Sequence, residues 1–587
     1  MSVFQSVHEA LGSILDRLAL DLGDQPRPAF VVEPPRDPAH GDMATNVAMV
    51  LTKLAKKTPR FLAELIKPEL EALPFIESVS IAGPGFINMR LAPSAWHQEI
   101  KDILLAGLSY GDSSIGGGAK VNVEFVSVNP TGPMHAGHVR GAVLGDTLCR
   151  LLTKAGYDVT REYYMNDAGT QIDVLARTTH LRYRQALGED IGAIPEGLYP
   201  GEYLKDIAQA LVARDGDKWL HKEESVWLEP LRFFATSYLI EVIKEDLKLI
   251  GITHDVFSNE RVLIENGTLD KVFKILEEKG LIYTGTLPPP RGKVMEDWSP
   301  VPLVLFRSSQ FGDDVDRPLK KRDGSWAYVM PDIAYHYDKI RRGFLFMINV
   351  LGTDHGGYLE RMRPAVAALS DGKASLDVLF NNIVKVFKNG VPVKLSKRSG
   401  NLITLREMVE QVGAGAVRFF MLTRAPEAEL EFDFAKVVEQ SRDNPVFYVQ
   451  YAHARTHSVM RQAKTLIPDL DDSAQALAAQ DLSLMDEVEE LALVRSLASW
   501  PRAVQAAALA REPHRIAFYL MGLAADFHSF WNKGNDKAAL RFIQADDLKR
   551  TKVKLALVKA VQTVLANGLA VMGCRALEEM RHEQITP

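Results

Sequence analysis

The 587-residue chain has few cysteines and no long apolar run, and each shortage excludes a class of protein. Its two cysteines, Cys149 and Cys574, are too few for a disulfide scaffold or a cysteine-rich zinc site. Residues 1–24 mix acids into an amphipathic pattern and lack the uninterrupted apolar core of an export signal. We find no later stretch long and apolar enough to predict a membrane span. We therefore expect a cytoplasmic protein with no membrane partner.

The chain also lacks the excess of positive charge that is typical of proteins that bind nucleic acid over their whole surface. Its formal net charge is −6, so any binding to nucleic acid must depend on local basic patches. One candidate is the segment 537–559, whose cations outnumber Asp546 and Asp547: Lys537, Arg541, Lys549, Arg550, Lys552, Lys554 and Lys559. On a helix, the same residues also fit a solvent-exposed lysine-rich face.

One stretch, residues 121–156, combines a strand pattern, a sharp turn and a helix pattern. Apolar residues alternate over residues 121–125, as in a strand, with Glu124 near the strand end. Apolar residues over 139–152 recur at spacings of three and four, which predicts a helix with one buried face. Gly156 then fits the helix end.

The turn inside this stretch has the features of a phosphate-binding site. Proline and glycine residues at 130–133 make it sharp, and His135, Gly137 and His138 fall on the first turn of the predicted helix. Unpaired N–H groups and the positive end of the helix dipole favour an anion there, and imidazoles can donate to phosphate oxygens. Taken alone, the short HxGH pattern fits surface histidines after a turn equally well.

A second cluster, residues 394–401, places three cations, a glycine and an asparagine in one short segment, KLSKRSGN. Charge runs usually form solvated faces. Here an apolar run at 383–387 leads in, and glycine followed by asparagine suits a turn rather than a helix face. Lysines on such a loop can close over a departing phosphate chain.

The HAGH and KLSKRSGN segments together resemble the two signature motifs of class I aminoacyl-tRNA synthetases. The residues around them resemble the arginyl-tRNA synthetases in particular. Supporting stretches cover nearly the whole chain in the same order: residues 83–88, 163–171, 328–339, 352–358 and 444–455. Each stretch is weak evidence alone, but their shared order makes the resemblance specific.

The resemblance implies that ATP is a substrate and assigns it positions residue by residue. The implied ATP-binding residues are Pro130, Gly132, His135, Gly137, His138, Gly352, Asp354, Lys394, Ser396 and Lys397. Four of these carry catalytic roles, because their charges would stabilise the reacting phosphates: His135, His138, Lys394 and Lys397. We expect Mg²⁺ to be held mainly by the nucleotide, and we expect no structural metal.

The second implied substrate is L-arginine. A guanidinium is planar, always charged and offers five donors, so its selection requires carboxylates and carbonyls placed for paired hydrogen bonds. The matched motif positions are Glu124, Asn129, Tyr328, Asp332, Asp354 and His355. The roles of the last two stay open between arginine and the ATP ribose.

Alternating strand and helix patterns predict a multidomain α/β protein with a Rossmann-like parallel-sheet catalytic domain. The resemblance divides the chain into a small α/β N-terminal domain that recognises tRNA (1–112), a catalytic domain (120–433) and an all-α anticodon-binding helix bundle (434–587). Residues 172–300 form a mostly helical insertion with a scaffolding role. Family members often carry an Ala-Leu-Arg run where this chain has Ala416, Val417 and Arg418. The change is conservative, and we expect no loss of function from it.

The third implied partner is tRNA-Arg. Candidate contacts are Asn88 in the N-terminal domain and five residues of the helical domain: Tyr448, Tyr451, Arg455, Trp531 and Asn535. Aromatic side chains can stack on unpaired bases. Aromatics at helical spacing also serve as core residues, and about half of these are expected to do so.

The implied activity is the ligation of L-arginine to tRNA-Arg through an arginyl-adenylate, by a monomer that needs bound tRNA for the first step. Three alternatives remain open. A small-molecule nucleotidyltransferase also uses HxGH but fits the long helical C-terminal third poorly. A class I synthetase for glutamate, glutamine or lysine would share the ATP motifs, and a non-catalytic RNA-binding paralogue would be expected to lose them.

Overall fold

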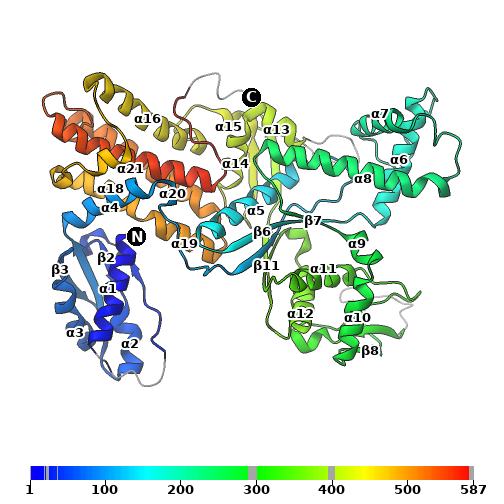
Figure 1. Ribbon diagram of the computed structural model, residues 1–587, viewed down its shortest axis with the longest axis horizontal. Coiled ribbons are helices and arrows are strands. Elements are labelled where there is room, and N and C mark those ends of the chain that lie inside the picture. Colours follow the sequence, from blue (N-terminus) through cyan, green and yellow to red (C-terminus); the bar gives the residue numbers. More distant parts are fainter. Residues whose placement is uncertain are drawn as a thin grey trace.

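The computed structural model describes residues 2–18, 20, 26–35, 37–287, 301–393 and 403–580. Figure 1 shows an N-terminal α/β unit below a bundle of C-terminal helices, with the sheet of the catalytic domain beside them. This arrangement confirms the predicted fold class: a parallel-sheet domain, an α/β N-terminal domain and an all-helical C-terminal domain.

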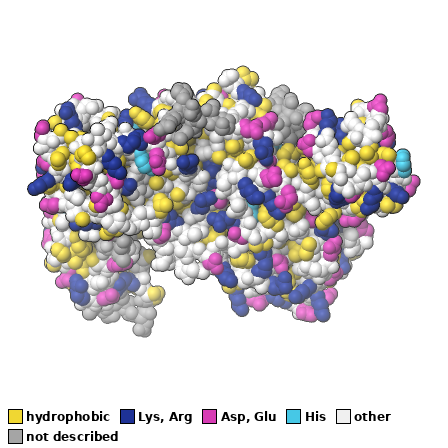
Figure 2. Space-filling model, turned by 45° about the horizontal axis from the view of Figure 1, so that its top comes forward, with side chains coloured by type: hydrophobic (Ala, Val, Ile, Leu, Met, Phe, Trp, Pro, Cys, Tyr) yellow, Lys and Arg dark blue, Asp and Glu magenta, His cyan; other side chains and the backbone are white. Residues whose placement is uncertain are grey.

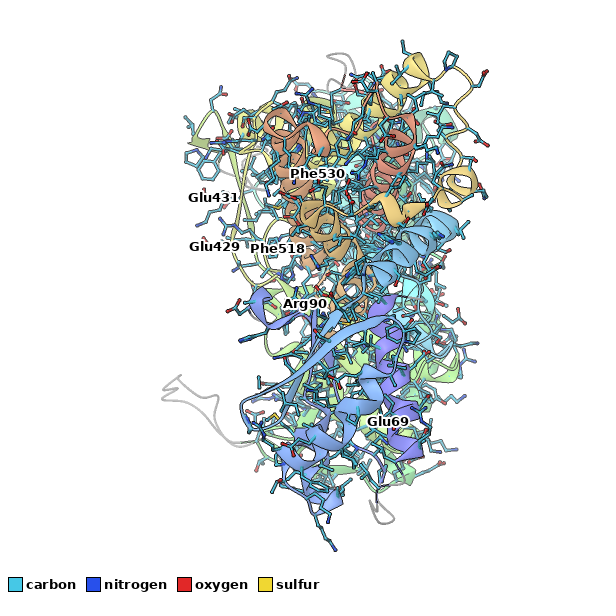
Figure 3. All side chains as sticks on the ribbon, turned by 90° about the vertical axis from the view of Figure 1, so that its left-hand side faces the viewer. Glu69, Arg90, Glu429, Glu431, Phe518 and Phe530 are labelled. Carbon is cyan, nitrogen blue, oxygen red and sulfur yellow. The ribbon has the colours of Figure 1, made fainter. Side chains whose placement is uncertain are left out.

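The N-terminal unit is an antiparallel sheet of order β1-β2-β4-β3 covered by helices. Its elements are α1 (Val3–Arg17), β1 (Val32–Glu33), β2 (Met43–Thr45), α2 (Val47–Ala55), α3 (Pro59–Glu71), β3 (Ile76–Ala82) and β4 (Phe86–Leu91). The next helix, α4 (Pro93–Ala106), packs instead against helices of the C-terminal bundle. In Figure 3, Arg90 of β4 lies at the level where this sheet meets the bundle.

The catalytic domain is built on a five-stranded parallel sheet of order β12-β11-β5-β6-β7. Its strands are β5 (Lys120–Glu124), β6 (Asp158–Met165), β7 (Val256–Asn259), β11 (Phe346–Gly352) and β12 (Ser375–Asn381). The helices that connect or cover them are α5 (Ala136–Lys154), α9 (Glu260–Glu265), α10 (Thr268–Glu278), α11 (Val329–Arg341) and α12 (Tyr358–Ser370). The central strand β5 is buried on both faces, so Asn122 and Glu124 are buried although the sequence pattern placed them opposite the apolar face.

The helix α5 packs unusually close to β5. A Cβ atom at Gly145 would lie 2.3 Å from the ring of Phe125, so only glycine permits this approach. Both residues belong to the stretch from which the sequence predicted a strand, a turn and a helix. The structure confirms that order.

The predicted insertion contains α9 and α10 and also the helices α6 (Thr170–Ala186), α7 (Tyr203–Asp215) and α8 (Glu224–Leu249), which project from the sheet at the right of Figure 1. Its later part is not helical throughout, because β7 joins the edge of the parallel sheet. A small antiparallel sheet follows, made of β8 (Ile282–Gly285), β9 (Leu303–Phe306) and β10 (Arg317–Pro318).

A second three-stranded sheet, β14-β13-β15, and three helices connect the catalytic domain to the bundle. These elements are β13 (Val384–Lys388), β14 (Val391–Pro392), α13 (Leu405–Val412), α14 (Ala414–Met421), β15 (Leu430–Asp433) and α15 (Phe434–Val438). The bundle itself comprises α16 (Pro445–Leu466), α17 (Ala474–Ala478), α18 (Val488–Ala498), α19 (Trp500–Ala510), α20 (His514–Asp536) and α21 (Leu548–Val571).

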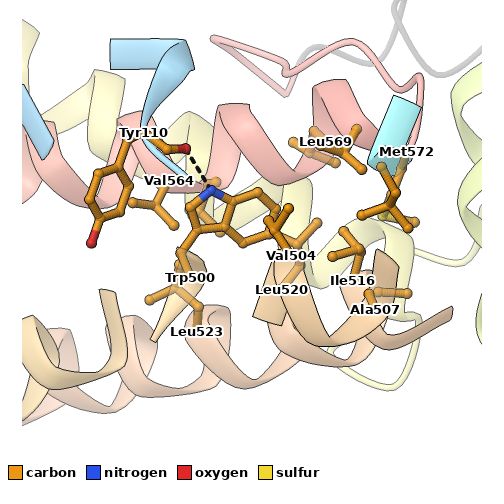
Figure 4. Packing of buried hydrophobic residues seen from close by; sticks show 14 of the residues in the cluster. Tyr110, Trp500, Val504, Ala507, Ile516, Leu520, Leu523, Val564, Leu569 and Met572 are labelled. Atoms are coloured by element: carbon orange, nitrogen blue, oxygen red, sulfur yellow. Dashed lines mark hydrogen bonds between the residues drawn. The ribbon is translucent and has the colours of Figure 1, made fainter. Parts of the chain in front are cut away.

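The bundle core also binds the segment that enters the catalytic domain. The fully buried Trp500 packs among Val504, Leu520 and Leu523, and its Nε1–H donates to the carbonyl oxygen of Tyr110 at 2.9 Å (Figure 4). A buried indole needs such a partner for its single donor. The bond fixes the chain between α4 and β5 against the bundle.

One helix corrects the expectation that no stretch could span a membrane. By length and composition α21 is apolar enough, but 78% of its most apolar 18-residue window is buried inside the protein. In the described part of the chain it is the only such helix. Its contacts with α4, α16 and α20 make it a core helix of the bundle.

Candidate active site

The carboxyl ends of β5, β6 and β11 meet at one edge of the sheet, where a parallel fold places its ligand site. Glu124 ends β5, the segment after β6 carries the predicted Asn166–Gln171 stretch, and β11 ends at Gly352. Asn129, in the turn after β5, donates to the Gln171 side chain at 3.1 Å. The tertiary structure thus joins two of the motifs that the sequence placed about 40 residues apart.

The backbone between Glu124 and Asn129 is strained. Val126 has a φ of 71° and Ser127 a φ of 42°, which is the left-handed region that β-branched residues avoid. The Ser127 N–H donates back to the carbonyl oxygen of Phe125 at 3.1 Å, closing a three-residue turn. The Ser127 hydroxyl donates to Glu124 at 3.1 Å and accepts from the Tyr164 N–H at 3.0 Å. These bonds hold the strained turn in place, as is common at functional sites.

The two histidines of the HxGH motif cap the helix α5. His135 is the N-cap, and its Nδ1 accepts from the N–H of Gly137 at 3.2 Å. His138 accepts from the His135 N–H at 3.4 Å, which completes a reciprocal capping box. The two rings face each other with centroids 3.7 Å apart. The rings therefore sit over the positive end of the helix, where an anion is favoured.

The chain that follows the KLSKRSGN segment, from Ile403 onward, is bonded to the backbone of the HxGH turn. The N–H of Ala136 donates to the carbonyl oxygen of Ile403 at 3.0 Å, and the Leu405 N–H donates to the Met134 carbonyl oxygen at 3.0 Å. His135 and Thr404 pair as an isolated bridge between these segments. The predicted Lys394, Ser396 and Lys397 lie outside the described residues. The described chain resumes at Ile403, which bonds to the backbone of the HxGH turn.

Next to Glu124 lies a buried polar network that the sequence analysis missed. The ammonium of Lys339, on α11, donates to Glu124 Oε2 at 2.8 Å and to Asn349 Oδ1 at 3.2 Å. The Asn349 amide lies 3.2 Å from His336 Nε2, and His336 Nδ1 lies 2.8 Å from the Asp332 carbonyl oxygen. Because that oxygen only accepts, Nδ1 carries the proton. The spacing of 332, 336 and 339 on one helix face was the available sequence signal.

Burial controls the charge of the two titrating groups on this face of α11. It lowers the pKa of His336 to about 3, with help from the nearby charge of Lys339, so this imidazole is neutral. It raises the pKa of Asp332 to about 7, and the negative charges of Glu124 and Glu260 raise it further. No described residue donates a hydrogen bond to the Asp332 carboxylate. A bound cation would therefore stabilise the ionised form of the Asp332 carboxyl.

The remaining predicted arginine and ATP positions lie at the open end of β11 and at the start of α11. Asp354 and His355 are exposed, with the carboxylate 3.6 Å from the imidazole. A Cβ at Gly352 would fall 2.4 Å from the Asp354 side chain. Tyr328 is 89% exposed, and its ring lies 4.8 Å from the Lys321 ammonium instead of contacting Asp332. It thus lies on the rim of the site.

The helical insertion contacts the turn directly, which its predicted scaffolding role did not specify. The hydroxyl of Tyr203, on α7, donates to the carbonyl oxygen of Thr131 at 2.6 Å. Its ring lies against Gly132, where a Cβ would be 3.4 Å away, while Pro130 is buried beside it. The insertion therefore supports the same turn that precedes the HxGH histidines.

In the helical domain, four of the five candidate tRNA contacts lie around Trp531: Arg455 contacts its ring, Tyr451 contacts Arg455, and Asn535 lines a cavity with it. The Arg455 guanidinium lies 4.5 Å from the Tyr451 ring and 4.6 Å from the Trp531 ring. Trp531 and Asn535 line a cavity of about 190 Å³ together with Gln462 and Phe542. The fifth candidate, Tyr448, packs against His528 inside the bundle.

Asn88 and part of the basic segment are less accessible than the other candidate RNA contacts. Asn88 lies on the central strand β4 and is only 5% exposed. In the basic segment 537–559, Lys554 is buried in an ion pair with Glu490, and Lys537 and Arg550 pair with acids before α18. Figure 2 shows cations and acids interspersed over the visible face rather than one continuous basic surface.

Comparisons with known proteins cover the chain from end to end. Family models match residues 5–91 (arginyl tRNA synthetase N terminal domain), 99–421 (tRNA synthetases class I (R), catalytic domain) and 449–580 (DALR anticodon binding domain). An arginine–tRNA ligase of Parvibaculum lavamentivorans is 56% identical over 94% of both chains. One from Cereibacter sphaeroides is 53% identical over 99% of this chain and 100% of its own. The Thermus thermophilus arginyl-tRNA synthetase structure shares the fold (TM-score 0.72, 22% identity, 98% and 100% coverage).

Proposed function

This chain belongs to the arginyl-tRNA synthetases of class I, and we propose how its own residues carry out the ligation of L-arginine to tRNA-Arg. The observation that carries the proposal is the bond between Ala136 and Ile403. It joins the HxGH turn to Ile403, the first described residue after the lysine segment 394–401, beside the carboxyl ends of β5 and β11. In this proposal the histidines, the lysines and the acidic residues serve one site.

In the first step, the arginine carboxylate attacks the α-phosphorus of ATP. The bond from that phosphorus to the bridging oxygen breaks, and pyrophosphate leaves with the electron pair. His135 and His138 stabilise the phosphate charge, together with the N–H groups at the start of α5. Lys394, Ser396 and Lys397 bind the departing pyrophosphate, and the two lysines neutralise its charge. Gly137 leaves room for the nucleotide.

In the second step, a hydroxyl of the terminal tRNA ribose attacks the activated carbonyl. The ester forms as the hydroxyl loses its proton, and AMP leaves. Neither step requires a protein nucleophile, so the chain contributes position and electrostatic stabilisation. We propose that bound tRNA is needed before the first step proceeds.

Mg²⁺ would come with the nucleotide and neutralise charge on its phosphates. The described residues contain no cluster of three or more His, Cys, Asp or Glu side chains placed to hold a metal. We propose that phosphate oxygens and water hold most of the metal's coordination sites, and that the protein has no structural metal.

The arginine side chain binds between α11 and the end of β5. Asp332 provides the charge for the guanidinium, because its carboxylate has no donor from the described chain and its pKa is raised towards 7. Glu124, whose two oxygens accept from Lys339 and Ser127, adds negative charge from the neighbouring strand, and Asn129 contributes from the turn. Tyr328 closes the rim, and Asp354 and His355 complete the end of β11, where they serve either arginine or the ATP ribose.

For tRNA, we propose that the cavity at Trp531 and Asn535 accepts an unpaired base, next to Arg455, which contacts the rings of Trp531 and Tyr451. Tyr448 supports the bundle there, and Asn88 is the proposed tRNA contact of the N-terminal domain.

We propose three domains: residues 1–112, residues 120–433 with the insertion at about 172–300, and residues 434–587. We propose a cytoplasmic monomer without a membrane partner, to be checked by light scattering on the purified protein.

The decisive experiment is ATP–pyrophosphate exchange with each amino acid, with and without total tRNA. We expect exchange with arginine that depends on tRNA. Exchange with lysine or glutamate but not arginine would overturn the assignment to arginine. No exchange in any mixture would favour an RNA-binding paralogue. Exchange that needs no tRNA and does not depend on which amino acid is added would favour a small-molecule nucleotidyltransferase.

A further inference from the structure

Lys339 is a buried cation placed beside a carboxylate of the arginine site. Its side chain has no exposed surface, and its ammonium lies 2.8 Å from Glu124, 3.2 Å from Asn349 and 4.2 Å from the centre of the Tyr335 ring. Glu124 is also held by the Ser127 hydroxyl through its other oxygen. Both carboxylate oxygens of Glu124 therefore have a fixed partner supplied by the protein.

The same ammonium acts on the pocket where arginine is proposed to bind. Asp332 and Lys339 lie seven positions apart on α11 and so share one face of that helix, and the charges of Glu124, Glu260, Arg361 and Lys339 all act on the Asp332 carboxyl. An acidic pocket without an internal cation would attract any basic side chain. Lysine is the amino acid most able to exploit this, because its ammonium is a compact point charge on a flexible stem.

We propose that Lys339 is a specificity-determining residue, whose ammonium occupies the place beside Glu124 that the ammonium of a competing lysine would take. A second ammonium there would meet a like charge in a buried site. The guanidinium of arginine spreads its charge over a planar fork and can use the free lone pairs of Asp332. The protein thus rejects lysine with a lysine of its own.

This inference rests on the proposed arginine site. Its test is Lys339→Met, which keeps the apolar stem and removes the charge, assayed by ATP–pyrophosphate exchange with saturating tRNA. The measured quantity is the ratio of kcat/KM for lysine to kcat/KM for arginine. We expect this ratio to rise by about 10- to 100-fold, because Glu124 becomes available to a substrate ammonium.

A matched control is Lys554→Met. Lys554 and Glu490 form another fully buried lysine–glutamate pair, in the helical bundle. Breaking that pair should lower stability as much as Lys339→Met does, while leaving the lysine-to-arginine ratio unchanged. Lys339→Gln provides a second variant in case Lys339→Met does not fold, because its amide can still donate to Glu124 without a charge.

An equal loss of activity with both amino acids in Lys339→Met, or in Lys339→Gln, would overturn the inference and assign Lys339 a structural role only. A rise in the ratio in the Lys554→Met control would also overturn it. Failure of the wild-type protein to activate arginine would instead overturn the proposed function. The wild-type and variant measurements therefore distinguish the two claims.

Discussion

The guanidinium of Arg418 in α14 donates to the Asp146 carboxylate in α5 at 2.5 Å, and only 1% of its side chain is exposed. Its other nitrogens donate to the carbonyl oxygens of Ile250, at the end of α8 in the insertion, and Met572, at the end of α21, both at 2.7 Å. Burial raises the pKa of Asp146, but Arg418 and Arg150 outweigh this effect and hold it below its ordinary value. One side chain thus joins the HxGH helix, the insertion and the helical domain.

Gly573→Ala tests this connection without changing a charge. Gly573 has a φ of 68°, and a Cβ there would lie 2.2 Å from Arg418 Nη2. The control is Gly280→Ala, whose φ is also 68° but whose Cβ would meet nothing within 4 Å. The strain common to both should cost about 1–2 kcal/mol, and the displaced guanidinium about 1–3 kcal/mol more. Urea denaturation measures the difference, and equal losses would show that the contact adds no stability.

Arginine binding should strengthen as pH rises through about 7. The Asp332 carboxyl has a pKa of about 7 in the substrate-free protein, mainly because it is buried, and only its ionised form pairs with a guanidinium. Below pH 7 the KM for arginine should therefore rise about tenfold per pH unit. Asp332→Asn should raise this KM at every pH and remove its pH dependence near 7. A pH-independent KM in the wild type would contradict this prediction.

The same pKa predicts a change in stability with pH. Because the folded pKa of Asp332 is raised above its ordinary value of 3.8, its contribution is present below pH 4 and is lost as pH rises through 7. Added arginine should reverse that loss by pairing with the ionised form. The increase in melting temperature caused by arginine should therefore be larger at pH 8 than at pH 6. Asp332→Asn should show the same increase at both pH values.

His138 can be tested separately for catalysis and for helix capping. His138→Ala removes both, and we expect adenylate formation to fall by about 10²–10³-fold with little change in tRNA affinity. His138→Gln provides the control, because glutamine at this position can preserve the capping box. If imidazole chemistry matters, the glutamine variant should be as slow as alanine but more stable. Activity restored by glutamine would mean that His138 serves only as a cap.

Trp531→Ala should weaken tRNA binding and leave arginine and ATP parameters unchanged. Loss of a stacked base contact costs about 1–3 kcal/mol, so the KM for tRNA should rise by roughly 5- to 150-fold. Phe518→Ala is the matched control, because Phe518 is a 47% exposed aromatic on the same helix α20 (Figure 3). Similar KM values for tRNA in the two variants would show that the cavity at Trp531 does not bind tRNA.

The order of short motifs could be predicted from sequence because each motif is local. The strand before Glu124, the turn and the capped helix after His135 follow from residues that are neighbours in the chain. The site around Glu124 could not be predicted in the same way. Lys339 and Asn349 lie 215 and 225 positions downstream and meet Glu124 only because β11 pairs with β5.

The sequence by itself determined the family, the order of the domains and the residues of the two signature motifs, because local spacing and residue chemistry carry that information. Tertiary structure decided which charges face each other. It buried Lys339 beside Glu124, left Tyr328 on the rim and brought Ile403 to Ala136. The reason is physical: burial and electrostatic pairing depend on distances in space, and those are set by sheet order and helix packing rather than by separation along the chain.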